Sequence, residues 1–327
     1  MSRLYLNKIT SLPMPPRPIK QSAHRGPFIL SAFGTYRSWR QKKLKNYPGS
    51  LEEIIVSIDD PRRLTKKEKF LLVRSCRKTN MVLYCSHTEG DPDKQIPLLL
   101  GRQLGLNRLD HNWLADKDGV TSLAVRNDAE HNHYIPYTNR RIRWHTDGYY
   151  NPLYRQVSSL LLHCVSSAAS GGENSLLDHE IAYIKLRDEN PDFIRALMAD
   201  DTMTIPARLD ESGVARPDQS GPVFSVDPQS ANLHMRFTAR TRSILWKDDP
   251  LTRDAVDFLS EFLSSNSSYI FRGRLEPGMG LVSNNVLHDS TSFTDNAQKQ
   301  RLLYRARYFD RVENTGLYDV PLTRAVV

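Results

Sequence analysis

Residues 141–152 read RIRWHTDGYYNP, and this stretch decides what fold and what site are expected of the chain. Within it, His145 and Asp147 are separated by a single residue. On an extended chain, residues two apart project to the same side, so both side chains can reach one metal ion from the end of a strand. The pattern therefore predicts a metal site built on a β-strand.

A third ligand is expected at His288. This residue follows a Pro-Gly turn at 277–278 and a short apolar run at 280–282, so it comes just after a second strand. Two histidines and one carboxylate on one face of a metal are typical of non-haem Fe(II) oxygenases, because three positions stay open for a bidentate keto acid and for O2.

A His-x-acid pair alone is weak support, because His87 and Glu89 have the same spacing as His145 and Asp147. We discount His87 because Gly90-Asp-Pro92 turns the chain at once. The pair His131-Asn-His133 imitates a cupin site, but the Glu and Gly that complete a cupin motif do not follow it.

Three arginines follow His288 on a run that is typical of a strand, 302–309. Arg301, Arg305 and Arg307 are at even spacing and are expected to point to one face. Clustered cations on a strand favour an anionic partner, and arginine binds a carboxylate through two parallel hydrogen bonds. Salt bridges within the protein are the alternative, and the candidate partners are Asp289, Asp295 and Asp310.

The hydrophobic pattern predicts a mainly β chain with helical inserts. Amphipathic spacing predicts helices at 64–79, 96–104, 179–198 and 250–264. Short β-like runs are expected at 81–85, 122–125, 157–165, 175–177, 202–205, 223–226, 234–238, 269–275, 280–282 and 302–309. Many short strands favour a sandwich or a barrel.

The domain organisation expected is an irregular, basic, Pro-rich arm at 1–50 followed by a single domain at 51–327. Helical inserts at 179–198 and 250–264 interrupt this domain. The polar residues 210–220 contain Gly213 and Pro217, so we predict a mobile loop there.

The net charge of +8 and the pI near 9.3 favour anionic partners without choosing among them. The basic runs at 37–45 and 62–69 are expected to be solvated faces, and no motif for nucleic-acid binding accompanies them. Three cysteines with no CxxC spacing argue against a disulfide framework or a cysteine zinc site. With neither a signal sequence nor a membrane-spanning run recognised, a cytoplasmic location is expected.

From about Leu64 to Phe309 the chain resembles the taurine dioxygenase family of Fe(II)/2-oxoglutarate-dependent oxygenases. Four ordered segments carry the resemblance: Trp144-His-Thr-Asp147, Gly171-Gly-Glu-Asn174, the Pro277-Gly turn that leads to His288, and Arg301-x-x-x-Arg305.

The resemblance implies a jelly roll, a double-stranded β-helix flanked by helices. It implies that His145, Asp147 and His288 bind the iron, and that Arg301 holds the distal carboxylate of 2-oxoglutarate. Asn174 stands where the family has a threonine that assists this carboxylate, so an amide would replace a hydroxyl. Arg305 matches the arginine that binds the acidic group of the substrate, and whether it binds substrate or 2-oxoglutarate stays open.

The expected activity is therefore oxidation of a C–H bond in a small anionic or zwitterionic metabolite, with O2 consumed and succinate and CO2 released. Hydroxylation is the default outcome, and desaturation, ring formation or cleavage stay open. The residues expected to contact the substrate are Tyr149, Tyr150, Asn151 and Arg305, and Tyr137 and Asn139 are expected beside them.

Two other functions stay open at this point. One is an iron oxygenase that acts on a metal-chelating substrate without 2-oxoglutarate. The other is a non-catalytic protein whose basic surface binds nucleic acid or an acidic partner. Assembly into a homo-oligomer also stays open.

Overall fold

The computed structural model describes residues 26–111, 116, 118–126, 135–210, 213–240 and 244–320. This part of the chain is mainly β, with a few helices, as the sequence predicts. None of the helices in the described part is both long and apolar enough to cross a membrane.

The largest sheet has six strands in the order β1-β2-β16-β5-β19-β3. Strands β1 and β2 run parallel, and every other neighbouring pair in this sheet is antiparallel. The bounds of the strands are β1 Ile55–Ser57, β2 Met81–Cys85, β3 Thr121–Leu123, β5 Ser159–Ser166, β16 Met279–Ser283 and β19 Leu302–Tyr308.

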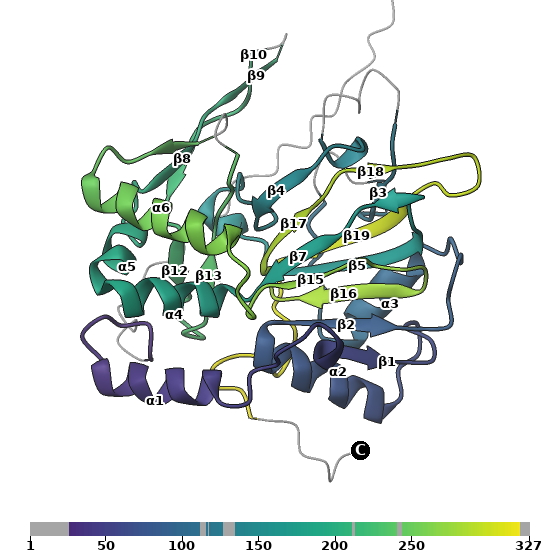
Figure 1. The fold of residues 1–327 in the computed structure, drawn as a ribbon, viewed down its shortest axis with the longest axis horizontal. Helices are drawn as coiled ribbons and strands as arrows, with labels where there is room; N and C mark the ends of the chain where they lie inside the picture. Colours follow the sequence, from purple (N-terminus) through teal and green to yellow (C-terminus); the bar gives the residue numbers. More distant parts are fainter. Residues whose placement is uncertain are drawn as a thin grey trace, which may run out of the picture.

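A second sheet of four antiparallel strands has the order β15-β7-β17-β4. Its strands are β4 Ile142–His145, β7 Asn174–Leu177, β15 Phe271–Gly273 and β17 Leu287–Ser290. Figure 1 shows that this sheet interleaves teal strands from the middle of the chain with green to yellow strands from its last third. The fold thereby joins two segments that are far apart in the sequence.

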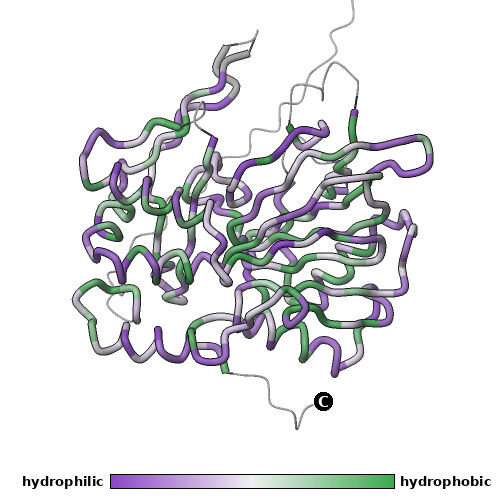
Figure 2. The backbone as a smooth tube through the Cα atoms, in the orientation of Figure 1, coloured by the Kyte–Doolittle hydropathy of each residue, from purple (hydrophilic) through white to green (hydrophobic). Residues whose placement is uncertain are grey.

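The two sheets share one apolar core. Leu160 and Leu162 of β5 and Leu176 of β7 belong to the same buried cluster. Leu161, between the two β5 residues, belongs instead to a cluster on the opposite face of the large sheet. This alternation is what the two-residue period of a strand requires, and Figure 2 shows hydrophobic residues along the central strands.

Two helices cover the outer face of the large sheet: α2 (Lys66–Thr79) and α3 (Gln95–Gln103). Leu72 of α2 and Leu100 of α3 pack in one cluster with Leu161 of β5. Both helices were predicted from the sequence, and their bounds differ from the predicted ones by one or two residues.

A helical layer stands beside the sheets, on the left in Figure 1. It contains α4 (His179–Glu189), α5 (Pro191–Leu197) and α6 (Pro250–Ser264). The smaller strands and 3-10 helices are β6 Ser170–Gly171, β8 Met203–Ile205, β9 Arg208–Asp210, β10 Gly213–Arg216, β11 Gln219–Gly221, β12 Phe224–Val226, β13 Leu233–Met235, β14 Leu245–Trp246, β18 Phe293–Thr294, η1 Glu52–Ile54, η2 Ile135–Tyr137 and η3 Leu153–Arg155.

The single helix predicted for 179–198 is two helices. Asn190 ends α4 with an extended backbone (φ −153°) and caps α5 by accepting a hydrogen bond from Asp192 N at 3.0 Å. Pro191 occupies the first turn of α5, where its missing N–H costs nothing. In the middle of one long helix the same proline would break the hydrogen-bond ladder.

The irregular arm predicted for 1–50 is wrong at α1 (Phe33–Leu44), which is a twelve-residue helix. Residues 1–25 lie outside the described part of the chain. The helix was missed because its sequence has no clear apolar stripe. It is held by the buried Tyr36 and by ion pairs from Arg40 and Lys43. Lys43 is buried and lies 2.6 Å from Asp178 and 2.5 Å from Glu180, so the prediction of a solvated basic run is also wrong at this residue.

The segment 210–220, predicted as a mobile loop, contains paired strands where the structure describes it. β9 pairs with β10 as an antiparallel hairpin, and β11 pairs with β8. Residues 211–212, between the paired strands, lie outside the described residues. The polar composition that predicted a loop instead fits an antiparallel strand pair that can face water.

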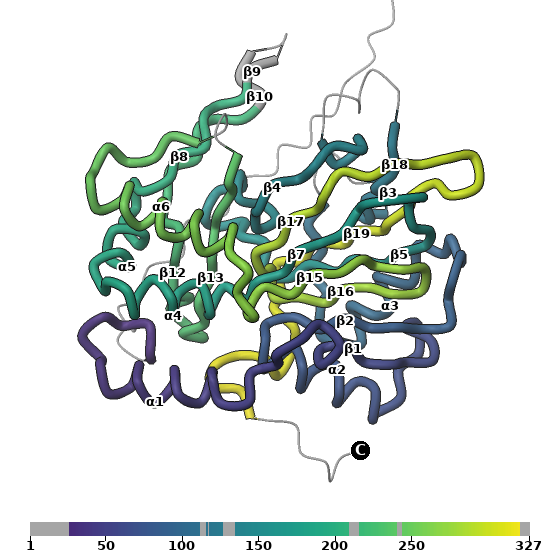
Figure 3. Tube along the Cα trace, viewed as in Figure 1, coloured from purple at the N-terminus to yellow at the C-terminus, as the bar shows by residue number. Residues whose placement is uncertain are grey.

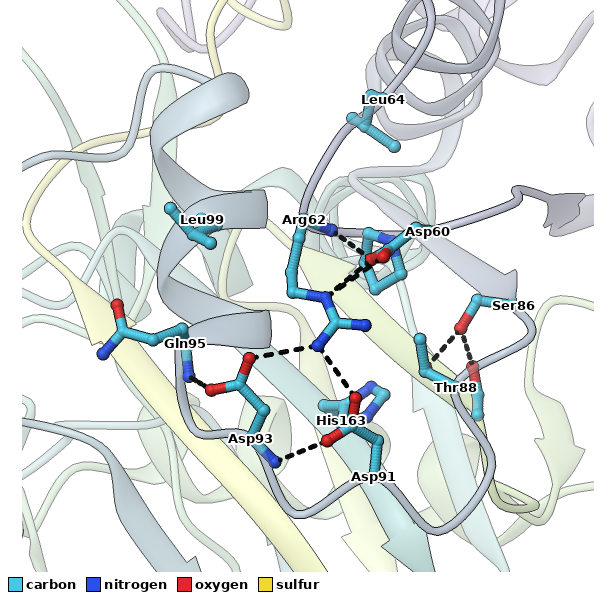
Figure 4. A network of polar contacts seen from close by, with 12 residues as sticks. Asp60, Arg62, Leu64, Ser86, Thr88, Asp91, Asp93, Gln95, Leu99 and His163 are labelled. Atoms are coloured by element: carbon cyan, nitrogen blue, oxygen red, sulfur yellow. Dashed lines mark hydrogen bonds and ion pairs between the residues drawn. The ribbon is translucent and has the colours of Figure 1, made fainter.

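A polar network ties two loops together over the large sheet (Figure 4). Arg62 lies 3.0 Å from Asp60, 2.8 Å from Asp91 and 3.1 Å from Asp93, with the buried His163 of β5 close to Asp91. The network connects the segment after β1 to the segment before α3. Arg62 is therefore paired rather than part of a freely solvated basic face.

Candidate metal centre

The two histidines predicted as ligands face each other across neighbouring strands. His145 ends β4, and His288 pairs with it directly in the antiparallel register of β17. Their ring centroids are 4.2 Å apart. Figure 3 shows β4 and β17 side by side although they differ widely in colour along the chain.

Asp147 brings its carboxylate to the same place. Its Oδ2 lies 3.9 Å from His288 Nε2, and its side chain is 5% exposed. Thr146, between His145 and Asp147, bonds in another direction, because its hydroxyl accepts a hydrogen bond from Phe237 N at 3.1 Å. Thr146 therefore anchors this turn, and the expected metal ligands are the residues on either side of it.

Hydrogen bonds fix which nitrogen each histidine offers. His145 Nδ1 lies 2.9 Å from the carbonyl oxygen of Arg143, and His288 Nδ1 lies 3.0 Å from that of Val286. A carbonyl only accepts, so Nδ1 carries the proton in each neutral ring and donates it. Each Nε2 is then an unprotonated lone pair, which is the form that binds a metal.

The charges suit metal binding at neutral pH. Burial, helped by the neighbouring His288, lowers the pKa of His145 to about 3, so the ring is neutral. Burial opposes ionisation of Asp147, but the positive charges of Arg305 and Arg307 outweigh it and hold the pKa of that carboxyl well below its ordinary value. Asp147 Oδ2 is buried with no hydrogen-bond partner, so a polar atom is left to be satisfied by a bound group.

Across the described residues, no three His, Cys, Asp or Glu side chains already stand as close together as the ligands of a bound metal. His145, Asp147 and His288 converge without reaching that spacing. A metal at this place therefore needs small side-chain adjustments that draw the three groups inward.

Asn285 holds the two ligand-bearing segments together, and it is not among the residues predicted from the sequence. Its side-chain oxygen accepts from Asp147 N at 2.8 Å, and its amide nitrogen donates to the carbonyl oxygens of Asp147 at 2.9 Å and Val157 at 2.7 Å. Asn285 has a left-handed backbone (φ 53°) three residues before His288. The Asn-Asn pair at 284–285 is a turn signal in the sequence, because asparagine tolerates this conformation.

The three arginines expected to share one face have three different surroundings. Arg305 Nη1 lies 3.2 Å from Asp147 Oδ1. Arg307 pairs with Asp110 at 2.6 Å, so it does form a salt bridge, but its partner is none of the three predicted carboxylates. Arg301 lies over the ring of Phe293, 4.7 Å from the centroid.

Arg301 and Asn174 meet at one pocket, whose walls also include Gly171, Gly172 and Leu303. One N–H of the Asn174 amide donates to the carbonyl oxygen of Asp289 at 3.0 Å. Burial lowers the pKa of Arg301, and the positive Arg274 nearby adds to this effect, although the guanidinium stays charged. A charged group that faces a pocket from a largely buried position is suited to an anionic ligand.

The residues expected to contact substrate are placed differently from one another. Tyr149 stands edge-on to His145, with ring centroids 6.4 Å apart, and Tyr150 accepts a hydrogen bond from Arg307 at 2.8 Å. Asn151 closes a turn, donating its side-chain amide to the carbonyl oxygen of Arg155 at 3.0 Å. The two tyrosines therefore border the ligands, while the amide of Asn151 is used within its own loop.

The other residues considered lie as follows. Tyr137 is buried beneath Arg126, 5.4 Å from its guanidinium, and the carbonyl oxygen of Asn139 accepts from Phe293 N at 3.2 Å. His87 is exposed at the end of β2. The pair at 131 and 133 lies outside the described residues.

Two sequence comparisons bear on this site. Residues 92–307 match the family described as taurine catabolism dioxygenase TauD, TfdA family. A uridine-5'-phosphate dioxygenase of an Amycolatopsis species is 29% identical over 171 residues, which cover 50% of this chain and 60% of that protein. A uridine-5'-phosphate dioxygenase of a Streptomyces species is 28% identical over 213 residues, which cover 58% of this chain and 70% of that protein.

A comparison of structures agrees on the fold. The crystal structure of the non-haem iron oxygenase OrfP in complex with Fe and alpha-ketoglutaric acid superposes with a TM-score of 0.54 and 18% sequence identity. The match covers 76% of this chain and 81% of that one. At this identity the likeness concerns the fold.

Proposed function

The chain belongs to the taurine catabolism dioxygenase TauD, TfdA family, and on this premise we propose that it is an Fe(II)/2-oxoglutarate-dependent dioxygenase. The observation that carries the proposal is the convergence of His145, Asp147 and His288. Backbone carbonyls engage Nδ1 of each histidine, which leaves both Nε2 atoms to bind a metal together with Asp147 Oδ2, a buried atom without a protein hydrogen bond. These three atoms would hold the iron. When bound, the iron would bring 2-oxoglutarate and O2 together and supply the oxidising power for a C–H bond.

We place the distal carboxylate of 2-oxoglutarate between Arg301 and Asn174. In the register of the second sheet, His288 pairs with Leu176 and Ser290 pairs with Asn174, so the pocket lies two residues along the strands from the metal ligand. Two residues of strand span roughly 6.6 Å. A five-carbon diacid with one end at the metal has the length to place its other carboxylate at Arg301.

The fold supports this arrangement. We propose that the six-stranded and four-stranded sheets form a double-stranded β-helix, with the site between them at the ends of β4 and β17. The single domain expected at 51–327 would also include α1, because Lys43 of that helix pairs with Asp178 and Glu180, and the helices at 179–198 and 250–264 would be inserted into it. Leu160, Leu162 and Leu176 between the sheets would keep bulk water from the reacting groups.

The substrate is proposed to be a small anionic metabolite, and uridine 5'-phosphate is the first candidate because two relatives are dioxygenases of that nucleotide. Tyr149 and Tyr150 border the metal ligands and would orient the substrate from one side. Asn151 would shape the loop that carries them, and Arg155, Arg305 and Arg307 would give this side a positive character. The free cysteines among the described residues, Cys76, Cys85 and Cys164, fit the reducing cytoplasm that we propose as its location.

The test is turnover under air with Fe(II), 2-oxoglutarate and uridine 5'-phosphate, with succinate measured. Substrate-dependent succinate is expected for the nucleotide, while uridine, which lacks the phosphate, is expected to stimulate far less. Equal stimulation by both would reject the anionic substrate but keep the enzyme class. Substrate oxidation without succinate would support an oxygenase that works without 2-oxoglutarate, and failure to bind Fe(II) would reject the enzyme altogether.

A further inference from the structure

Both arginines near the metal ligands act on one oxygen of Asp147. Arg305 Nη1 lies 3.2 Å from Asp147 Oδ1, and Arg307 Nη1 lies 3.6 Å from the same atom. The other oxygen, Oδ2, accepts no hydrogen bond and lies 3.9 Å from His288 Nε2. The two oxygens of the Asp147 carboxylate therefore differ. Two arginines lie beside Oδ1, whereas Oδ2 has no hydrogen bond.

Arg307 is held in turn by groups behind it. Its Nη2 lies 2.6 Å from Asp110 Oδ2, and its Nη1 donates to the hydroxyl of Tyr150 at 2.8 Å. The backbone of Asp110 donates to the carbonyl oxygen of Arg307 at 2.8 Å, so the two residues are joined twice. Both side chains are at most 2% exposed, so neither can rotate freely.

The buried charges along this chain of contacts are paired. Arg305 and Arg307 carry two positive charges, and Asp147 and Asp110 carry two negative charges. The half-exposed Arg155 adds a further positive charge 3.2 Å from Asp110 Oδ1. A buried ion is expensive unless it is paired, so each of these four groups depends on the others for its position. Asp110 therefore determines how strongly Arg307 attracts the carboxylate of Asp147, although Asp110 itself does not contact the metal ligands.

We infer that Arg305 and Arg307, with Asp110 behind them, are positioning residues that orient Asp147 to bind the metal through Oδ2 alone. One-oxygen binding leaves the coordination positions that a keto acid and O2 require. Arg305 is then bound to a protein carboxylate rather than to the acidic group of the substrate or cosubstrate. The inference rests on the proposed function, because it concerns how the same metal is held.

The test is metal binding itself, measured by titrating the purified chain with Mn(II) or Co(II) in the absence of 2-oxoglutarate. Arg305→Met and Arg307→Met are expected to weaken metal binding roughly 10- to 100-fold, the usual effect of losing a partner of a metal ligand. The visible spectrum of bound Co(II) should also change, because it reports the coordination number. Arg272→Met is the control: this exposed arginine on β15 bonds to the carbonyl oxygen of Ser265 and should leave metal affinity unchanged.

Two further variants keep the inference testable if a methionine variant fails to fold. Asp110→Asn keeps the size of the side chain and should weaken metal binding by releasing Arg307. Arg305→Lys keeps the charge but loses the planar guanidinium, so its metal affinity should lie between wild type and Arg305→Met.

The results separate the inference from the proposed function. Wild-type protein that binds no divalent metal rejects the proposed function. Wild-type binding with unchanged affinity and Co(II) spectrum in Arg305→Met, Arg307→Met and Asp110→Asn rejects only the inference. A raised KM for an anionic substrate with unchanged metal affinity in Arg305→Met would assign Arg305 to the substrate instead.

Discussion

Asn285 binds the peptide groups on both sides of Asp147, although the two residues are 138 positions apart in the chain. The amide of Asn285 also donates to Val157, so one side chain joins the β16–β17 connection, the metal-ligand turn and the approach to β5. The positions of Asp147 and His288 are thus set together by a residue that cannot itself bind the metal in this arrangement.

Asn285→Ala is expected to destabilise the protein by about 2–4 kcal/mol. Loss of the amide leaves buried backbone groups unsatisfied, at about 1–3 kcal/mol, and alanine is strained at a positive φ by roughly 1 kcal/mol. Urea denaturation measures the change. Asn46→Ala is the matched control, because Asn46 has a similar φ of 52° but is exposed, so only the backbone strain applies. Similar losses in both variants would show that the amide contacts contribute little.

Arg301→Ala is expected to raise the KM for 2-oxoglutarate by roughly 10- to 100-fold, since a hydrogen bond to a charged group contributes about 1.5–3 kcal/mol. Asn174→Ala should have a smaller effect, because one N–H of that amide is already engaged with the carbonyl oxygen of Asp289. Arg272→Ala is the control, because this exposed arginine on the neighbouring β15 bonds to Ser265 instead. An equal effect of the Arg301 and Arg272 substitutions on succinate formation would argue against the pocket as the binding place.

Stability should fall as the pH drops below about 6.5. Burial lowers the pKa of His145, His179 and His234 to about 3 and that of His163 to about 4, so these rings are neutral in the folded chain. The unfolded chain binds protons at its ordinary histidine pKa near 6.5, and each such group can then cost up to about 1.4 kcal/mol per pH unit. The loss should continue down toward pH 4, and below that the lowered pKa of Asp147 adds a second loss.

Urea denaturation of the metal-free protein at several pH values between 7.5 and 4.5 measures this dependence. His163→Gln removes one of the four titrating groups and should make the fall shallower. A free energy of unfolding that stays constant from pH 7 to pH 5 would contradict the assigned neutral state of these histidines.

Much of the fold was predictable from local pattern. Short apolar runs predicted the strands β2, β5, β7, β8, β12, β15, β16 and β19, and apolar spacing predicted the helices α2, α3 and α6. The helix α1 did not, because its ion pairs join Arg40 to Asp188 and Lys43 to Asp178, residues more than a hundred positions away. The hydrophobic periodicity of a sequence does not predict such a contact between distant residues.

The candidate site, like the fold, was predictable from the sequence only in part. A short motif identifies His145 and Asp147, because residues two apart on a strand share a side. Asp110 and Asn285 could not be identified in this way, since their roles depend on pairing between distant segments. The even spacing of the arginines on β19 predicted a shared face but not that one of them would pair with the metal ligand.

Lys43→Met is expected to destabilise the protein by about 3–5 kcal/mol, because removing one partner of a buried ion pair leaves its carboxylates uncompensated. The two carboxylates are Asp178, which also caps α4 by accepting from Glu180 N at 2.9 Å, and Glu180 itself. Lys42→Met is the matched control, because Lys42 is the neighbouring lysine on α1 and its side chain is exposed.

The double variant Lys43→Met/Glu180→Gln should regain part of the loss, because one of the two uncompensated charges is then removed. Urea denaturation of wild type, Lys43→Met, Glu180→Gln and the double variant measures the coupling between the two positions. If α1 were only a loosely attached arm, Lys43→Met and Lys42→Met would be equally mild and the double variant would recover nothing. The expected large and partly recoverable loss would instead make α1 an integral part of the folded domain, so that the domain begins before residue 51.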